Sequence, residues 1–171
     1  MLAIIFVVLA FASRFLPHPW HFTPVAAALL FFGARGSRRQ MWFPIALLIL
    51  SDVILTKYVY GFAFSWEIAV SWAWYAAILL LGTRLRDNSK PLWIGASALA
   101  ASVSFFLVSN FAVWAAAAMY PKTFSGLMAC YTAGVPFFRN DVLGTLLYTA
   151  AMFATPALLK RPAVTQDRAV A

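Results

Sequence analysis

Acidic residues are scarce in this chain of 171 residues, which has 5 Asp and Glu against 13 Lys and Arg. Charged residues make up only 11% of the sequence, whereas about a quarter is usual in a soluble domain. So little charge cannot cover the surface of a soluble protein whose hydrophobic fraction is 64%. We therefore predict a membrane protein, most of which faces lipid or other helices.

The chain also lacks the motifs of known chemistries. Cys130 is its single cysteine, which excludes an internal disulfide and a cysteine cluster for zinc or iron–sulfur. The sequence contains no G-x-S-x-G, no P-loop and no dinucleotide-binding glycine pattern. We expect no enzymatic activity and no cofactor, and active transport would need a separate energising ATPase or coupling subunit.

The positive charge is distributed in a pattern. Most basic residues fall in every second gap between hydrophobic stretches, namely Arg35, Arg38 and Arg39, then Arg84, Arg86 and Lys90, then Lys160, Arg161 and Arg168. Loops rich in Lys and Arg stay cytoplasmic, so the net charge of +8 indicates topology and needs no nucleic-acid partner. We predict a multi-pass protein of the bacterial inner membrane with both termini in the cytoplasm.

Six hydrophobic stretches predict an all-α, polytopic fold, a compact bundle of six transmembrane helices. The stretches are 2–16, 21–34, 41–57, 67–83, 92–119 and 141–159. The first two are short against the roughly 20 residues that a crossing needs, and the fifth must tilt or project. We expect residues 1–160 to form this single domain and 161–171 to be a short cytoplasmic tail.

The segments 14–22, 58–66 and 120–140 then lie outside and are rich in aromatic residues. These rings form either an interfacial aromatic belt or the lining of a site for an organic ligand. We expect 120–140 to be a long loop that acts as a lid, with turns at Gly126, Gly134 and Pro136.

Asp52 is the strongest single signal, because it lies in the apolar run ALLILSDVILTKY. A carboxylate there costs about 2.5–3.5 kcal/mol on insertion unless it faces protein or water. Its partner is either Lys57, five positions on, or Arg14, which ends the first stretch. Glu67 and Asp141 are the other carboxylates that the Arg14 guanidinium could meet.

Two histidines, His18 and His21, lie three apart in HPWH, and neutral imidazole is a common metal ligand. Pro17 and Pro19 flank His18 and disfavour a regular helix there. Two histidines indicate a metal site only weakly, so we expect loop or ligand contacts and no metal.

Further polar residues lie near the outer ends of the stretches. The amide of Asn110 needs partners, either another helix or a ligand. Asn140 or Asp141 is expected to cap the sixth stretch, which leaves Arg139 for a ligand, while Glu67 suits the start of the fourth. The predicted substrate-binding residues are Arg14, His18, His21, Asp52, Glu67, Asn110, Tyr120, Arg139 and Asn140.

With these features the chain resembles, over nearly its whole length, the substrate-binding S components of energy-coupling factor (ECF) vitamin transporters. The resemblance implies a six-span protein whose ligand pocket opens outward between the outer helix ends. The segments PHPWHFTPVAAALLFFGA and LLILSDVIL are also similar to a group of small bacterial membrane proteins without an assigned activity. The A-x-x-x-A motif with which S components often dock their coupling subunit is missing, since Val7 follows Ala3 at +4 and Arg14 follows Ala10.

We therefore predict a protein that captures a small organic solute, such as a vitamin or its precursor, from the outer side of the lipid bilayer. Its partners would be that ligand and an energising ATPase or coupling module. The alternative is a non-catalytic subunit or assembly factor of a larger membrane complex. An outer-side cavity lined by the residues above favours the first, and a filled core favours the second.

Overall fold

Helices make up nearly all the regular structure in the computed structural model, which describes residues 1–17 and 21–159. The α-helices are α1 Leu2–Ser13, α2 Val25–Arg35, α3 Trp42–Ile54, α4 Glu67–Arg84, α5 Pro91–Ala116 and α6 Phe124–Leu159. A 3-10 turn at Arg38–Gln40 precedes α3, and a π-helical turn at Leu55–Val59 extends it. No strand occurs within the described residues, so the all-α prediction is confirmed.

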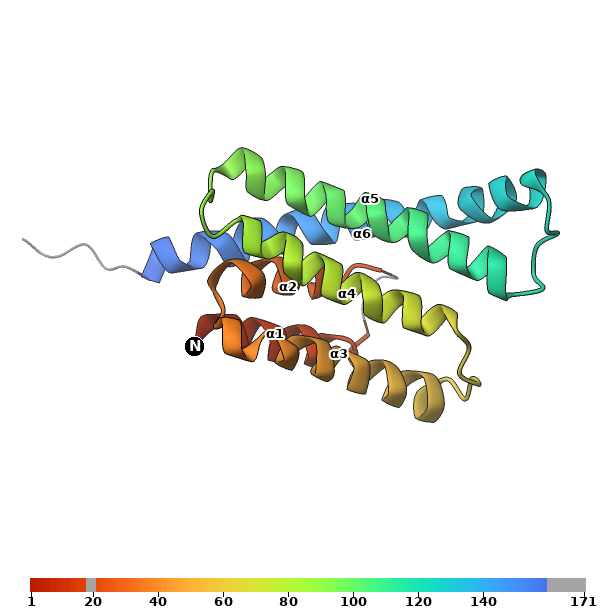
Figure 1. Ribbon diagram of the computed structural model, residues 1–171, viewed down its shortest axis with the longest axis horizontal. Helices are drawn as coiled ribbons and strands as arrows, with labels where there is room; N and C mark the ends of the chain where they lie inside the picture. The colour runs from red at the N-terminus through yellow and green to blue at the C-terminus, as the bar shows by residue number, and fades with distance from the viewer. Residues whose placement is uncertain (18–20, 160–171) are drawn as a thin grey trace, which may run out of the picture.

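Helix α2 is the centre of the bundle (Figure 1). Every residue from Val25 to Ala34 is buried, and the helix contacts α1, α4, α5 and α6. A helix that is apolar all round belongs in an interior, and the sequence VAAALLFFGA of α2 has no polar face to turn outward.

The crossing of α2 and α4 depends on two glycines. A Cβ atom on Gly33 would lie 2.3 Å from the carbonyl oxygen of Leu79, and one on Gly82 would lie 2.5 Å from that of Leu30. Both distances are far below van der Waals contact with rigid backbone. Small residues let membrane helices approach closely, and here they bring the two backbones together.

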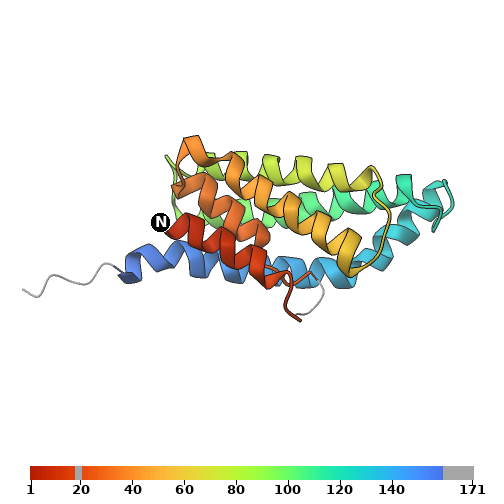
Figure 2. The same cartoon turned by 90° about the horizontal axis from the view of Figure 1, so that it is seen from below.

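The helices differ greatly in length. At 1.5 Å per residue, α1 and α2 are about 18 Å and 16 Å long, short of the roughly 30 Å hydrocarbon core of a bilayer. Three described segments are long and apolar enough to cross a membrane: Arg38–Val59, Pro91–Ala116 and Phe124–Leu159. The protein is therefore a membrane protein. Figures 1 and 2 show that α1 and α2 fill one half of the bundle, while the α5–α6 hairpin extends farthest at the other end.

The two ends of the bundle differ in their connectors (Figure 1). Met1, the connectors 36–41 and 85–90, and the end of α6 lie at one end, which we call the basic end. The opposite, aromatic end has the connectors 60–66 and 117–123. At the basic end, Arg86 donates through Nε to the carbonyl oxygen of Gly33 and through Nη2 to that of Gly36, both at 2.7 Å. Arg86 thus ties the connector 85–90 to the end of α2 and to the connector 36–41.

The prediction of a long lid at 120–140 is wrong, because α6 begins at Phe124 and includes most of that segment. The first turns of α6 are held against α5. The Cys130 Sγ lies 3.4 Å from the carbonyl oxygen of Asn110, and the Tyr131 hydroxyl donates to that of Leu107 at 2.8 Å. Gly134 packs so closely on Asn110 that a Cβ atom would lie 2.5 Å from the amide oxygen. This packing overrides the weak helix propensity of glycine.

The turns and the N-terminal cap predicted for the sixth helix are wrong for the same reason. Gly126, Gly134 and Pro136 are all helical, so the turns predicted at these residues do not form. Asn140 and Asp141 lie mid-helix, so neither caps the N-terminus as predicted. The Thr123 hydroxyl accepts a hydrogen bond from the Gly126 amide at 3.2 Å and provides the cap instead.

Candidate functional site

Helix α1 ends and helix α2 begins in the middle of the bundle and not at one of its ends (Figure 1). A cavity of about 580 Å³ lies between the connector residues 14–17 and 21–24 and helices α3 to α6, and we call it the connector cavity. It exists because α1 and α2 are too short to fill the half of the bundle beyond them. The residues that give it polar or aromatic character include Arg14, His21, Asp52, Tyr75, Phe105 and Asp141.

An ion pair between Arg14 and Asp52 forms one wall of the connector cavity. The Arg14 Nη2 lies 2.5 Å from Asp52 Oδ1, and Nη1 donates to the Ser51 hydroxyl at 2.6 Å. Asp52 also accepts hydrogen bonds from Trp72 Nε1 at 3.0 Å and from the Tyr75 hydroxyl at 3.3 Å. The pair thus joins the end of α1 to α3 and α4.

The two side chains of this pair are only 17% and 11% exposed, so little water screens their attraction. Of the partners predicted for Asp52, Arg14 is the one observed. Lys57 instead places its ammonium group 5.5 Å from the centre of the Tyr58 ring. The guanidinium faces the cavity already neutralised and held in a fixed orientation.

Aromatic rings form a second part of the site around His21. Its ring lies 5.9 Å from that of Phe105 and 5.4 Å from that of Phe137, and Trp74 lies 4.8 Å from Phe105. The backbone of His21 is left-handed, with φ at 61°. Non-glycine residues in that region carry strain of about 1–3 kcal/mol and often occur at functional sites.

Asp141 connects the connector cavity with a smaller one. The second cavity, of about 170 Å³, lies between α5 and α6, and we call it the side cavity. The described residues that line both cavities are His21, Phe105 and Asp141. The Asp141 side chain is buried, and its Oδ2 has no hydrogen-bond partner among the described residues.

Buried hydroxyl groups continue from Asp141 along α6. Thr145 and Thr149 follow at intervals of four residues, so the three side chains lie on one side of the helix. Ser102 of α5 is buried as well. Within the described residues, the hydroxyls of Ser102, Thr145 and Thr149 lack a hydrogen-bond partner. A line of polar groups therefore runs from the cavities towards the basic end.

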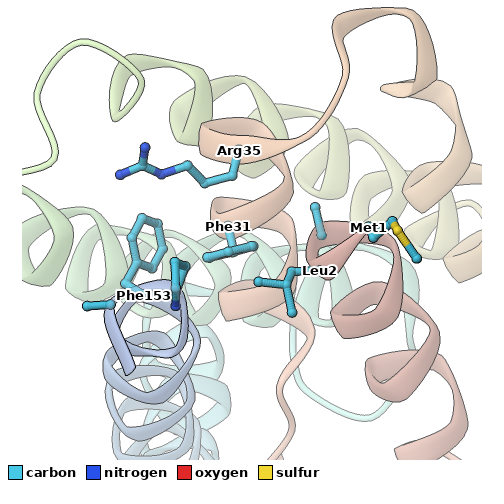
Figure 3. Close-up of a pocket in the computed structure, with 8 residues that line it drawn as sticks. Met1, Leu2, Phe31, Arg35 and Phe153 are labelled. Carbon is cyan, nitrogen blue, oxygen red and sulfur yellow. The ribbon is translucent and has the colours of Figure 1, made fainter. Parts of the chain in front are cut away.

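A third and larger hollow, of about 730 Å³, lies at the basic end (Figure 3). Leu2 of α1, Phe31 and Arg35 of α2, and Phe153 of α6 line it. Its side chains are apolar except for Arg35, whose Nη2 donates to the Ser89 hydroxyl at 3.1 Å. The chemically varied site is therefore the connector cavity and not this hollow.

Residues 1–167 match the family described as "Family of unknown function (DUF6580)". The chain belongs to the DUF6580 family. The match extends over α1 to α6, so the connector cavity lies wholly within the DUF6580 region. No curated protein and no solved structure shows significant similarity to the chain.

The structure brings some of the predicted site residues of this DUF6580 protein together and separates others. Arg14, His21 and Asp52 line the connector cavity, and Asn110 lines the side cavity. The Asn110 amide also donates to the carbonyl oxygen of Phe106 at 2.8 Å. His18 lies outside the described residues.

The other predicted residues lie elsewhere. Glu67 is the first residue of α4, as predicted, and its carboxylate accepts a hydrogen bond from the Ser65 hydroxyl. Tyr120 is in the connector between α5 and α6, while Arg139 and Asn140 are in α6. None of these four is among the described residues that line either cavity.

Sequence reasoning missed the aromatic contributors from the helices, namely Trp72, Trp74, Tyr75 and Phe105. The segment WAWYAA carries three of them, and its indole and phenol groups within an apolar stretch were the available signal. Asp141 was expected as one of two possible caps, with Asn140, because the sixth helix was predicted to start at 141 and not at Phe124. No group of three His, Cys, Asp or Glu side chains suited to a metal ion occurs among the described residues.

Proposed function

We propose that this protein lies in the bacterial inner membrane and captures a small organic solute from the outer side, as the S components of ECF transporters do. The connector cavity carries this proposal. Its volume of about 580 Å³ lies in the range of about 300–1,000 Å³ that is usual for small-molecule sites. It also combines apolar and aromatic walls with a few oriented polar groups, which is the usual composition of such sites.

The proposed topology places the basic end in the cytoplasm, because connectors 36–41 and 85–90 and their flanks contain six Arg and Lys residues. Both termini then lie inside. In this proposal all six helices are embedded in the membrane, but only α3 to α6 cross it. Helices α1 and α2 are too short to cross, so they enter from the cytoplasmic side and turn back at the connector cavity. This arrangement would place the cavity inside the membrane, accessible from the aromatic end.

Recognition in this proposal divides between the two parts of the site. The Arg14–Asp52 pair offers oriented donors and acceptors, while His21, Trp74 and Phe105 offer apolar and stacking surface. Release would follow the buried hydroxyls of α6 towards the hollow at the basic end, which Phe153 of the same helix lines. An energising module on the cytoplasmic side would supply the driving force, because the chain has no ATPase motif.

One observation favours the alternative role of a subunit in a larger membrane complex. The segment between α3 and α4 exposes a cluster of aromatic side chains, Tyr58, Tyr60, Phe62, Phe64 and Trp66. Such a cluster suits a protein partner as well as a membrane interface. The cavity and its ion pair have no role in that account, so we place it second.

Native mass spectrometry of the gently solubilised protein tests the proposal, with two matched Phe→Trp substitutions on α5. Phe105→Trp adds bulk to the cavity wall, while Phe111→Trp adds the same bulk at a half-exposed position that does not line the cavity. We expect the wild type and Phe111→Trp to retain a low-mass molecule that Phe105→Trp lacks. An empty wild type with a stoichiometric protein partner would contradict the proposal and favour the subunit role.

A further inference from the structure

The charges around the connector cavity do not balance. The charged and titratable side chains that line it are Arg14, His21, Asp52, Tyr60, Tyr75 and Asp141. Arg14 is the one Lys or Arg among the described lining residues, and Asp52 already pairs with it at 2.5 Å. With the His21 imidazole neutral, the ionised Asp141 carboxylate leaves the cavity with one uncompensated negative charge.

Asp141 is a buried carboxylate with one oxygen that the described residues leave without a partner. Asp141 is only 9% exposed, and its Oδ2 has no hydrogen-bond partner among the described residues. Ionisable groups inside a membrane protein are costly unless they are paired, and they commonly face a cavity or a substrate path. Asp141 faces cavities in this way, because it lines both the connector cavity and the side cavity.

The surroundings of Asp141 suit a positive charge on an organic body. Phe105 lines both cavities with Asp141, and its ring lies 4.8 Å from Trp74 and 5.9 Å from His21. Aromatic faces attract a cation that lies within about 6 Å of the ring centre. Rings of this kind would bind the organic part of a cation while the carboxylate neutralises its charge.

We infer that the solute of the connector cavity is a small organic cation, such as an amine or a quaternary ammonium compound, whose positive group binds at Asp141 among the rings of His21, Trp74 and Phe105. This inference rests on the proposed solute-binding function and gives it a substrate class. An anionic solute would meet two carboxylates and one guanidinium that is already paired, so the same cavity selects against it.

Binding measurements with three probes that share a phenyl ring test the charge preference. The probes are benzyltrimethylammonium, benzyl alcohol and phenylacetate, which are cationic, neutral and anionic. Isothermal titration of the full-length protein in a non-ionic detergent, with detergent blanks, gives the affinity of each. We expect the wild type to bind the cation at least tenfold more tightly than the anion.

The variant Asp141→Asn tests whether the preference for a cation comes from Asp141, because the amide keeps the size of the side chain and removes its charge. We expect at least a tenfold loss of affinity for benzyltrimethylammonium, with the affinity for benzyl alcohol unchanged. Asp87→Asn is the matched control, since it removes one negative charge at an exposed position in the connector 85–90. That variant should bind all three probes as the wild type does.

The outcomes distinguish a failure of the cation assignment from a failure of the solute-binding function. Equal or tighter binding of phenylacetate by the wild type would overturn the cation assignment and leave the solute-binding function standing. The same holds if Asp141→Asn keeps its affinity for the cation. A wild type that binds none of the three probes, and that retains no molecule on purification, would contradict both the substrate class and the solute-binding function.

Discussion

The Arg14–Asp52 pair predicts a measurable energetic coupling between the end of α1 and α3. The perturbation is a cycle of Arg14→Met, Asp52→Asn and the double variant. Asp52 accepts hydrogen bonds from Arg14, Trp72 and Tyr75, at 2.5, 3.0 and 3.3 Å. Replacing one residue of such a pair leaves the charge of the other residue without its partner inside the protein.

The expected magnitudes follow from these contacts. Asp52→Asn should cost about 3 kcal/mol, the lower end for a broken buried ion pair, because the side chains keep some exposure. Arg14→Met should cost about 2 kcal/mol, since Trp72 and Tyr75 still donate to the carboxylate. The double variant removes both charges and should cost about 3 kcal/mol, which gives a coupling energy of about 2 kcal/mol.

The assay is reversible unfolding in mixed micelles, followed by far-ultraviolet circular dichroism, from which the free energy of unfolding is obtained. Asp87→Asn, at an exposed position, is the control and should change that free energy by less than about 0.5 kcal/mol. The free energies lost in the two single variants could instead add up, within about 0.5 kcal/mol, to the loss in the double variant. That result would show that Arg14 and Asp52 do not interact, because independent sites are additive.

Two further predictions concern the helix crossing and the topology. Gly33→Ala or Gly82→Ala should each destabilise the protein by about 1–3 kcal/mol in the same assay, since the added Cβ meets backbone. Gly95→Ala, where nothing lies within 4 Å, should be neutral or stabilising, and equal effects at the three positions would exclude the close crossing. In a cysteine-free background, a membrane-impermeant maleimide should label Met119→Cys on intact spheroplasts and not Ser37→Cys. The reverse labelling would place the basic end outside.

Most helix boundaries could be predicted from hydropathy and charge. The predicted stretches 67–83 and 92–119 match Glu67–Arg84 and Pro91–Ala116 to within a few residues. The sixth helix was predicted to start at 141 and starts at Phe124. Glycine and proline between these positions indicated a loop. The contacts that keep the segment helical come from α5, far away in sequence, and a local pattern does not contain them.

The candidate site was predictable where charge stands out against an apolar background. Arg14 and Asp52 were proposed as partners for that reason, and the structure pairs them. Aromatic residues are common throughout the chain, so Tyr75 and Phe105 did not stand out. Arg139 was assigned to the site from the expected start of the sixth helix, and this assignment loses its support because α6 begins earlier.

A density map of the gently purified protein in lipid nanodiscs shows whether the connector cavity holds a solute. We predict density for a small molecule bounded by Arg14, Phe105 and Asp141. Side chains of the α1–α2 connector that fill this volume, with no room for a solute, would contradict it.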